Sequence, residues 1–484
     1  MHPKGGKMSL IHVNDITFGY EGSSKNVFEK VSFQIDTDWK LGLIGRNGKG
    51  KTTFLKLLLG DYTYKGTISK KVDVDYFPFT IEEKEKMAIE LVNEMAPNVE
   101  DWKIIRELNL LNTDAEILYR SFCTLSGGEQ MKILLISLFL KGNNFLLIDE
   151  PTNHLDSETR NQLIGYLKKK KGFIVVSHDR NFLDQVVDHI ISINNANIEI
   201  QKGNFSSWYE NKQAQEHFEL MQNEKLRKDI NKLEIASKNT ANWSDKIEKS
   251  KYNTKNSGSS IDRGYVGHQS AKMMKKSKVM ERRMEKSIEQ KSNLLKNMDR
   301  NDSLKIIPLE SKKNSYIMAK DIQIKYSDKV AFLPVSFEIK KGDRIAITGK
   351  NGIGKSSILK LILGNEIPYE GTLKVANDLK ISYVSQSTES LKGSLRELAR
   401  ENQIDESIFR AMLSKMGVSS EEFEKDLKYM SEGQKKKVLL AKSISEMAHI
   451  YIWDEPLNYI DILTRVQIEE AILKARDDSC FCGT

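Results

Sequence analysis

Two segments of the chain repeat one pattern of apolar and polar positions. Each opens with the alternation typical of β-strands, LIHVNDITFGY from Leu10 and YIMAKDIQIKY from Tyr316. A short apolar run, KLGLIG or RIAITG, then precedes a glycine-rich loop, and a helical run, TTFLKLLLG or SSILKLILG, follows it. The later runs NNFLLIDE, AHIYIWDE and KKGFIVVSHD predict buried strands. The pattern predicts two α/β domains.

The motifs within the two segments keep nearly constant spacing. GRNGKGKT begins at Gly45, and GKNGIGKS begins 304 positions later at Gly349. LSGGEQ and MSEGQK are 305 positions apart, and so are the carboxylates of Asp149 and Asp454. Matching offsets indicate a tandem duplication. We predict a first repeat at residues 8–205 and a second repeat at 313–484, with residues 1–7 as a tag or upstream start.

The segment between the repeats, residues 206–312, predicts a helical linker. It lacks glycine and proline through most of 206–250 and again through 269–300, with apolar residues at helical spacing. The intervening NTKNSGSSIDRGYVGHQS is loop-like, so we expect two long helices in an antiparallel hairpin.

Positive charge is concentrated in that linker. Residues 211–300 hold 21 Lys and Arg against 12 Asp and Glu, a net of +9, whereas the whole chain carries +8. A solvated helical surface is one interpretation, but an excess of one sign favours a polyanionic partner. The candidate RNA-phosphate contacts are Lys272, Lys275, Lys276, Lys278, Arg282 and Arg283. Trp243, Tyr252, Tyr265 and His268 near the tip could stack on bases or pack within the hairpin.

Composition excludes several classes of protein. The longest uncharged apolar run, ILLISLFL, is far too short to span a bilayer, and the N-terminus has no signal-peptide pattern. The three cysteines, Cys123, Cys480 and Cys482, form neither a disulfide framework nor a zinc-ligand set. We expect a cytoplasmic protein.

Both glycine loops fit the P-loop pattern G-x-x-x-x-G-K-[ST], whose backbone N–H groups wrap phosphates. Lys51 and Lys355 would reach the β- and γ-phosphates of ATP, and Mg²⁺ would be held by Thr52 with Asp149 and by Ser356 with Asp454. Glu150 and Glu455 follow the metal ligands and are suited to polarise water. His178 could stabilise charge on the γ-phosphate.

LSGGEQ places Ser126, Gly127 and Gly128 at a helix N-terminus, which is an anion site without a use in its own repeat. With this motif the chain resembles ATP-binding cassette (ABC) proteins, and specifically the ABC-F family of ribosome-associated ATPases. Within that family, TDWKLGLIGRNGKGKTT and the long linker are most similar to the Lsa-like antibiotic-resistance branch. The resemblance covers nearly the whole chain.

The resemblance implies that two cassettes close head-to-tail over two ATP molecules within one monomer. Tyr20 and Tyr326 would stack on adenine, with ordinary packing of each ring within its strand as the alternative. Gln386 would contact Mg²⁺ and water. The implied nucleotide contacts are Tyr20, Gly45, Asn47, Gly48, Gly50, Lys51, Thr52, Thr53, Ser126, Gly127, Gly128, Tyr326, Gly349, Asn351, Gly352, Gly354, Lys355, Ser356, Ser357, Ser431 and Gly433. The linker would enter the ribosomal E site, contact rRNA and the P-site tRNA, and protect against lincosamides, streptogramin A and pleuromutilins.

Three departures from the family pattern predict slow or asymmetric turnover. Phe79 stands where the first repeat should have its glutamine, and Glu432 replaces the first signature glycine of the second repeat. His178 lies 29 residues after Asp149, so equal spacing predicts the second histidine near position 483, within DDSCFCGT. FIVVSHD has no evident counterpart there. We therefore expect a second repeat that is incomplete at its C-terminus, lacks a central strand and is less stable.

Three alternative functions remain open on the sequence. A general ABC-F translation factor would lack the resistance role. The ATPase subunit of an exporter would need a membrane partner and would have no use for a basic hairpin. A DNA-associated ABC ATPase usually has longer coiled coils or zinc modules.

Overall fold

The computed structural model describes residues 9–22, 26–142, 144–153, 155–194, 197–250, 271–272, 275–276, 278–280, 282–284, 286–287, 304–326, 329–330, 332–350, 352–475 and 480–483. The side chains of 237–238, 240–250, 326 and 329–330 lie outside that description. The chain divides into two compact units, Met1–Trp208 with Asn301–Thr484, and Tyr209–Arg300.

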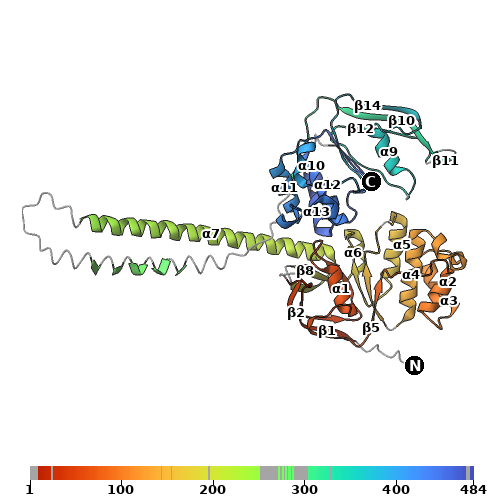
Figure 1. Cartoon of the computed structure of the whole chain (residues 1–484), viewed down its shortest axis with the longest axis horizontal. Coiled ribbons are helices and arrows are strands. Elements are labelled where there is room, and N and C mark those ends of the chain that lie inside the picture. The colour runs from red at the N-terminus through yellow and green to blue at the C-terminus, as the bar shows by residue number, and fades with distance from the viewer. Residues whose placement is uncertain are drawn as a thin grey trace, which may run out of the picture. The chain divides into compact units, whose positions relative to one another are not determined.

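A mostly parallel sheet forms the centre of the first repeat (Figure 1). Its order is β5-β6-β7-β3-β8-β9, and only the β8–β9 pair among these described strands is antiparallel. The strands are β3 (Lys40–Ile44), β5 (Asp73–Phe77), β6 (Asn144–Asp149), β7 (Phe173–Val176), β8 (His189–Asn194) and β9 (Asn197–Lys202). All four residues of β7 are buried, as expected for a parallel strand that is covered on both faces.

A smaller antiparallel sheet packs against the central one. Its strands, in the order β2-β1-β4, are β1 (Leu10–Phe18), β2 (Phe28–Asp36) and β4 (Lys65–Ser69). Ile11 and Val13 of β1 share a core with Leu41 and Leu43 of β3 and with Phe54 of helix α1 (Lys51–Leu59). The apolar alternation of the first strand therefore fixes the glycine loop between two sheets.

The remaining helices of the first repeat are α2 (Ala88–Met95), α3 (Asp101–Leu110), α4 (Gly127–Lys141), α5 (Ser157–Leu167) and α6 (Arg180–Val186), with short 3₁₀ helices at Ala115–Tyr119 and Phe122–Thr124. Helix α4 packs against α2 and α3 (Figure 1). Its first turn carries the LSGGEQ motif, so this group of helices positions the signature.

The second repeat has the same two-sheet arrangement, which confirms the predicted α/β duplication. Its antiparallel sheet contains β10 (Ser315–Tyr326), β11 (Lys329–Val330), β12 (Val335–Lys340) and β14 (Tyr369–Val375). Its parallel sheet has the order β13-β17-β16-β15, with β13 (Arg344–Ala346), β15 (Ile381–Val384), β16 (Ile450–Trp453) and β17 (Cys480–Gly483). The helices are α9 (Lys355–Ile362), α10 (Leu395–Glu401), α11 (Glu406–Lys415), α12 (Glu432–Ser445) and α13 (Ile462–Lys474), with 3₁₀ helices at Ser420–Glu422 and Leu427–Tyr429.

Strand β17 corrects the expectation that the second repeat lacks the counterpart of FIVVSHD. It pairs in parallel with β13 on one side and β16 on the other, as β7 pairs with β3 and β6. Phe481 stacks on Tyr451 with ring centroids 5.2 Å apart and contacts Trp453 edge-on. The central strand is therefore present, although CFCG shares little with FIVV in sequence.

The strand register also corrects the predicted position of the second histidine. Phe481 lies opposite Arg344 as Phe173 lies opposite Lys40, which is an offset of 308 rather than 305. Adding 308 to His178 gives position 486, and Gly483 is instead the counterpart of Val175. The difference arises because α13 is two residues longer than α5, and because six residues separate α13 from Phe481 where five separate α5 from Phe173.

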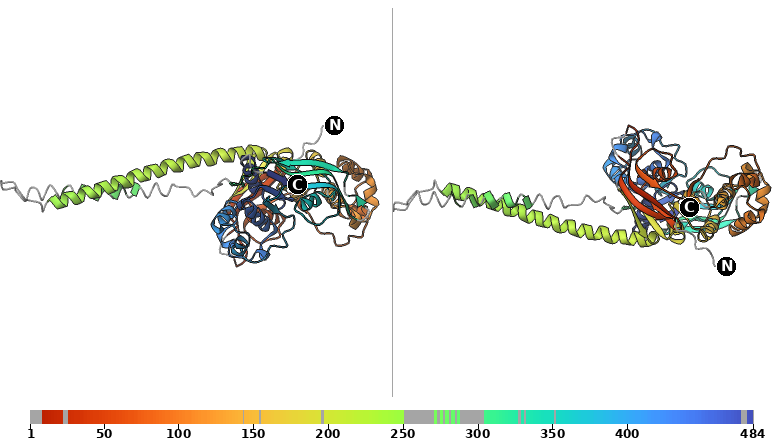
Figure 2. Two further views of the ribbon diagram at one scale, coloured as in Figure 1. Left: turned by 90° about the horizontal axis from the view of Figure 1, so that it is seen from above. Right: turned by 90° about the horizontal axis from the view of Figure 1, so that it is seen from below.

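The linker begins as one long helix, α7 (Phe205–Ser250), which is continuous in both views of Figure 2. Its first turn is fixed to the first repeat, because Ser206 donates from its backbone N–H and its hydroxyl to the Asp184 carboxylate at 2.7 and 2.6 Å. Phe205 and Trp208 are buried beside this contact. The described residues between 271 and 287 are also helical. The hairpin turn lies outside the described residues.

Lys272, Lys275, Lys276, Lys278, Arg282 and Arg283 all expose their side chains to solvent. The side chain of Trp243 and the whole of Tyr252, Tyr265 and His268 lie outside the described residues. Within the described part of the chain, we find no helix with both the length and the apolar character needed to cross a membrane. The three cysteines are free, with Cys480 and Cys482 buried in β17.

Candidate nucleotide-binding sites

Each glycine loop adopts a backbone that glycine makes available. Gly48 and Gly50 have φ of 78° and 94°, and Gly352 and Gly354 repeat these values at 77° and 102°. A Cβ on Gly50 would also approach Val27 Cγ1 to 2.6 Å. These left-handed positions let the loop wrap around a small central space. We call the cavity at the first loop site one and the cavity at the second loop site two.

The lysine and threonine of site one converge on the end of β6. Lys51 donates from Nζ to the Gly45 carbonyl at 2.8 Å and to Asn47 Oδ1 at 3.1 Å. Burial lowers the pKa of Lys51. Thr52 Oγ1 donates to Asp149 Oδ2 at 3.2 Å. The loop thus brings a cation and two oxygen ligands to one point.

Tyr76 also holds the Asp149 carboxylate, donating from its hydroxyl to Oδ2 at 2.8 Å. Burial and the Asp149 charge raise the pKa of Tyr76 well above its ordinary value, so the phenol stays a donor. Burial raises the pKa of Asp149, although the hydrogen bonds from Tyr76 and Thr52 oppose the shift.

Site one has the chemistry required by ATP with Mg²⁺. The cavity measures about 460 Å³, and a Cβ at Gly48 would meet no atom within 4 Å, which leaves the loop interior open. Thr52 and Asp149 supply the hard oxygen ligands that Mg²⁺ prefers. Lys51 and the turned loop amides supply positive charge for phosphates. The residues present therefore fit the nucleotide and its metal ion.

Glu150 lies at the edge of site one with His178. The Nε2 atom of His178 is 3.2 Å from Glu150 Oε1. Both Glu150 oxygens are enclosed, and among the described residues no side-chain amide or hydroxyl donates to them. Burial and the neighbouring Asp149 charge raise the pKa of Glu150 to about 7. Burial, with the nearby Lys51 charge, lowers the pKa of His178 well below its ordinary value.

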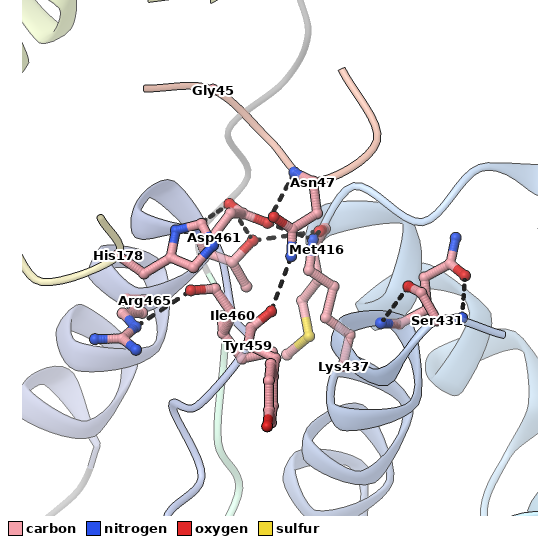
Figure 3. Close-up of polar contacts among 12 residues, drawn as sticks. Gly45, Asn47, His178, Met416, Ser431, Lys437, Tyr459, Ile460, Asp461 and Arg465 are labelled. Carbon is pink, nitrogen blue, oxygen red and sulfur yellow. Dashed lines mark hydrogen bonds and ion pairs between the residues drawn. The ribbon is translucent and has the colours of Figure 1, made fainter. Parts of the chain in front are cut away.

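The second repeat completes site one (Figure 3). Ser431, from the second signature motif, lines the cavity. Asn47 donates from Nδ2 to the Tyr459 carbonyl at 2.9 Å, and its backbone N–H lies 3.5 Å from Asp461 Oδ2. A Cβ on Gly433 would come within 2.8 Å of Asn47 Nδ2, so the second signature glycine is needed for this approach.

Asp461 is held by a buried ion pair. Lys437 Nζ lies 2.6 Å from Asp461 Oδ2, and the two side chains are 3% and 0% exposed. Burial alone would raise the pKa of Asp461, but the Lys437 ammonium and hydrogen bonds lower it well below its ordinary value. Figure 3 shows this pair between the first glycine loop and helix α12.

Glu432, which replaces the first signature glycine of the second repeat, makes its contacts within that repeat. Its carboxylate accepts from Thr388 Oγ1 at 2.5 Å and pairs with Lys435 Nζ at 3.3 Å. The Thr388 hydrogen bond lowers the pKa of Glu432, so the side chain is an anion with its own partners. The carboxylate that replaces the first signature glycine is therefore held by partners in its own repeat.

Site two is a larger cavity of about 630 Å³. Its glutamate, Glu455, contacts different groups from those that contact Glu150 in site one. Ser356 Oγ donates to Asp454 Oδ1 at 3.0 Å. Glu455 Oε2 accepts from Gln386 Nε2 and from Asn458 Nδ2, each at 2.8 Å. The lining from the second repeat includes Gly349, Gly352, Gly354, Lys355, Ser356, Ser357, Gln386 and Glu455, and that from the first repeat includes Asn153, Asp156 and Arg160.

The first signature motif is not among the described residues that line site two. Ser126 Oγ and its backbone N–H both donate to Glu129 Oε2 at 2.8 Å, which closes a capping box at the start of α4. Gly127 and Gly128 form the first turn of that helix. The Glu129 carboxylate thus accepts both donors of Ser126.

The predicted adenine contacts differ in what the structure describes. Tyr20 is 47% exposed, hydrogen-bonds Thr53 Oγ1 at 2.6 Å and lines site one. The side chain of Tyr326 and the whole of Asn351 lie outside the described residues. The nucleotide roles assigned to all these positions stay predictions.

The strand register supports the comparison of Phe79 with Gln386. Tyr76 lies opposite Leu147 on β6, and Tyr383 lies opposite Ile452 on β16, an offset of 307. Adding 307 to Phe79 gives 386. The two sites therefore differ at one equivalent position, an aromatic ring against an amide.

Sequence reasoning missed the contribution of four groups to these sites. Asp461 and Tyr459 lie in NYID, which repeats the NHLD of the first copy, and this repetition was the available signal. Arg465 follows Asp461 by one helical turn, as Arg160 follows Asp156. No feature of the sequence indicated that Tyr76 contacts the site, because a tyrosine in a strand ordinarily packs in the core.

Comparisons with known proteins match this geometry. The sequence profile of the family described as ABC transporter matches residues 28–153 and 332–458. Ribosome protection protein VmlR of Bacillus subtilis is 27% identical over 464 residues, covering 94% of this chain and 80% of its own length. Erythromycin resistance ATP-binding protein MsrA of Staphylococcus epidermidis is 28% identical, with coverage of 92% and 88%. ABC transporter F family member 2 of Arabidopsis thaliana is 26% identical, with coverage of 96% and 72%.

Solved structures give the same fold. The archaeal ribosome recycling factor aABCE1, in its complex with ribosomal stalk protein aP1, superposes with a TM-score of 0.62 at 19% identity over 97% of this chain and 84% of its own. RNase-L Inhibitor superposes with a TM-score of 0.60 at 19% identity and the same coverage. At this identity the likeness establishes the fold alone.

Proposed function

The chain belongs to the ABC transporter family, whose nucleotide-binding domain it carries twice, and we propose that it binds and hydrolyses ATP at site one and site two. The observation that supports this proposal is the composite lining of site one, where Ser431 and the Asp461 loop reach the first glycine loop. Each site then requires residues from both repeats, so a chain that carries the domain twice supplies both halves of each site.

In this proposal the P-loop lysines and amides bind the phosphates, and Thr52 with Asp149 or Ser356 with Asp454 holds Mg²⁺. The metal ion neutralises charge on the phosphates when bound. Glu150 and Glu455 orient the attacking water and accept its proton. His178 keeps Glu150 in place at site one.

We further propose that the two sites turn over unequally. Glu455 is oriented by two amide donors, whereas Phe79 has no donor to offer Glu150. Comparing the ATPase rates of Glu150→Gln and Glu455→Gln variants tests this. We expect Glu455→Gln to remove the larger share of turnover, and equal losses would contradict the proposal.

We propose that the partner is the ribosome, through rRNA and the P-site tRNA. Similarity to VmlR extends over 94% of the chain, and so includes the linker as well as the ATP-binding domains. Seven basic side chains on the described part of the second linker helix, the six candidate contacts and Lys286, are exposed to solvent. A row of such charges suits a phosphate backbone.

We also propose that the linker inserts at the E site and relieves inhibition by lincosamides, streptogramin A and pleuromutilins. Relatives named for ribosome protection and for erythromycin resistance support a resistance role.

Ribosome pelleting tests the partner. A Glu150→Gln, Glu455→Gln double variant binds ATP without hydrolysing it and should remain closed. We expect this variant to pellet with ribosomes in ATP and to remain in the supernatant without nucleotide. A second chain with Lys272, Lys275, Lys276 and Lys278 all changed to Gln is the matched control and should pellet weakly.

Failure of the double variant to pellet, with ATP binding intact, would contradict a ribosomal partner. Cell-free translation with lincomycin then tests the resistance role. Rescue of translation by the wild-type chain would support it, whereas binding without rescue would indicate a general translation factor.

A further inference from the structure

Two equivalent lysines lie on the helices that begin at the signature motifs. Lys132 belongs to α4 and Lys437 to α12, and each follows the signature serine of its own repeat by six residues. Both side chains are buried. Each ammonium donates to the carbonyl that ends the preceding α-helix, Leu111 at 3.4 Å and Met416 at 2.7 Å. The two lysines therefore share one anchor.

The remaining contacts of the two ammonium groups differ. Lys132 Nζ donates to Thr113 Oγ1 at 2.9 Å and to Gln162 Oε1 at 2.7 Å. Lys437 Nζ instead forms the ion pair with Asp461 Oδ2 at 2.6 Å (Figure 3). One lysine thus points to a glutamine of its repeat, and its equivalent points to an aspartate.

The two acceptors of the first repeat have counterparts in the second repeat. The residues equivalent to Thr113 and Gln162 lie 305 positions later and are Val418 and Gln467. A valine side chain offers no acceptor. Both Oε1 and Nε2 of Gln467 are enclosed without a hydrogen-bond partner among the described residues, which is a costly state for an amide. By its equivalence to Gln162, Gln467 is the acceptor for the second lysine when that lysine leaves its ion pair.

The two equivalent aspartates differ in the same sense. Asp461 is 0% exposed, and its Oδ2 lies 3.5 Å from the backbone N–H of Asn47 in the first glycine loop. Asp156 lines the wider site two, is only partly buried and has no ion pair among the described residues. The signature serines follow the same division, since Ser431 lines site one and Ser126 is not among the described residues that line site two. The lysine–aspartate pair therefore accompanies a seated signature.

We propose that Lys437 and Lys132 are positioning residues that change partner when their repeat closes on the opposite glycine loop. In the open position the lysine holds the glutamine of its repeat, and the aspartate faces solvent. In the closed position the lysine holds the aspartate, which ties the signature helix to the loop that reaches the other repeat. The structure contains one lysine in each position. The inference rests on the proposed binding of ATP and is independent of the ribosomal partner.

The difference between Thr113 and Val418 makes the two closures unequal. Thr113 gives Lys132 a second side-chain acceptor in the open position, and Val418 gives Lys437 none. The second repeat therefore loses fewer hydrogen bonds when its lysine moves to the aspartate. We expect site one to close at a lower ATP concentration than site two.

The test introduces the residue of the other repeat at each of these two positions in the full-length chain. Lys355→Ala confines nucleotide binding to site one, and the probe is a fluorescent, non-hydrolysable ATP analogue. In this background Val418→Thr adds an acceptor to the open position. We expect the half-saturating concentration of the analogue to rise about fivefold, which is the effect of one buried hydrogen bond.

The reciprocal change is made where Lys51→Ala confines binding to site two. Thr113→Val removes an acceptor from the open position of Lys132, so we expect the half-saturating concentration to fall about fivefold. A general loss of stability would weaken binding at both sites. Shifts of the same sign, or no shift at either site, would overturn the inference.

The two glutamines supply a matched pair of controls. Gln467→Leu removes an amide without a partner, so it should raise the thermal midpoint. It also removes the open position of Lys437, and analogue binding at site one should tighten about threefold. Gln162→Leu breaks a hydrogen bond that is formed and should lower the midpoint. A raised midpoint with unchanged binding in Gln467→Leu would overturn the exchange of partners.

Failure of the proposed function gives a different result. A folded wild-type chain that does not bind the analogue would refute ATP binding, and the exchange of partners with it. A chain that binds the analogue at both sites, with affinities that neither Val418→Thr nor Thr113→Val changes, would retain the proposed function and overturn the exchange alone.

Discussion

At the scale of single residues, the Lys437–Asp461 pair joins the second signature helix to the loop that meets site one. Both charges are removed from water, so each depends on the other. A buried pair of this kind adds little net stability, but loss of one partner leaves an uncompensated charge.

We predict that Asp461→Asn destabilises the chain by about 3–5 kcal/mol, because the Lys437 ammonium loses its counter-charge. Glu470→Gln is the control, since it removes an exposed pair with Lys474 and should cost less than about 0.5 kcal/mol. Denaturant unfolding near neutral pH measures both. Because the pKa of Asp461 is lowered on folding, the Asp461→Asn deficit should shrink as the pH falls toward that lowered value. A deficit that persists unchanged at acid pH would contradict this.

The pKa of Glu150 shifts in the opposite direction to that of Asp461, so the predicted change of stability with pH has the opposite sign. Its pKa rises on folding from 4.5 to about 7, so the nucleotide-free protein loses stability as the pH rises between these values. Above pH 7 the ionised carboxylate costs up to about 3 kcal/mol at about 1.4 kcal/mol per pKa unit. Glu150→Gln should therefore raise the thermal midpoint at pH 8 and leave it nearly unchanged at pH 4.5. Equal shifts at both pH values would point to packing instead.

The sequence predicted most of the residues that form the two sites, but few of the contacts between their side chains. Lys51, Thr52 and Asp149 were evident because phosphate and metal chemistry restricts the residue types. The approach of Asp461 and Arg465 was not, because it depends on how the two repeats pack. The carboxylate of Glu432 could be assigned only once Thr388 lay beside it.

At the scale of elements, the sequence predicted the strands and helices wherever apolar periodicity was long. Strand β17 was missed because four residues, two of them cysteine and one glycine, carry no periodic signal. Its place is set by partners on both sides. Counting from Asp454 also failed, since α13 exceeds the length of α5.

We predict that Phe481→Ala costs about 3–5 kcal/mol, because the buried ring lies between Tyr451 and Trp453 in the middle of the sheet. The control is Leu473→Ala on α13, whose side chain is 70% exposed and which should change stability by less than about 0.5 kcal/mol. Urea unfolding followed by tryptophan fluorescence compares the two. A small effect of Phe481→Ala would mean that β17 contributes little to the second repeat.

The joint between α6 and α7 gives a second element-scale prediction. Helix α6 follows His178 directly, and its Asp184 holds the first turn of α7 through Ser206. We expect Asp184→Asn to weaken this terminus by about 1 kcal/mol, as loss of a helix cap does, and to raise amide exchange there about fivefold. Ser207→Ala, at a neighbouring serine whose hydroxyl donates to the Asn204 carbonyl just before α7, is the control. Unchanged exchange at residues 205–208 would show the joint to be held by Phe205 and Trp208 packing.

At the scale of the whole molecule, the duplicated domains and the basic linker followed from spacing and charge alone.

The proposed RNA contacts predict a steep salt dependence. Changing Lys272, Lys275, Lys276 and Lys278 to Gln should reduce the slope of log affinity for ribosomes against log salt by roughly 3, at about 0.7–0.9 per phosphate contact. Lys169→Gln with Lys171→Gln, at exposed lysines of the first repeat, should leave it unchanged. Equal slopes for the two sets would contradict a linker-borne contact.

The place of β17 has a consequence for biosynthesis. Strands β13 and β16 are 104 residues apart from Ala346 to Ile450 and are joined only through β17, among the described strands of that sheet. As the chain emerges from the translating ribosome, β13 has no hydrogen-bonding neighbour in this sheet until Cys480–Gly483 appear. The strands of the first repeat's sheet are all synthesised within 202 residues, so that domain can be completed early. At that stage the second sheet still lacks the central strand that joins its two halves. Any pause in synthesis before residue 480 would expose that unfinished sheet to chaperones and to other nascent chains.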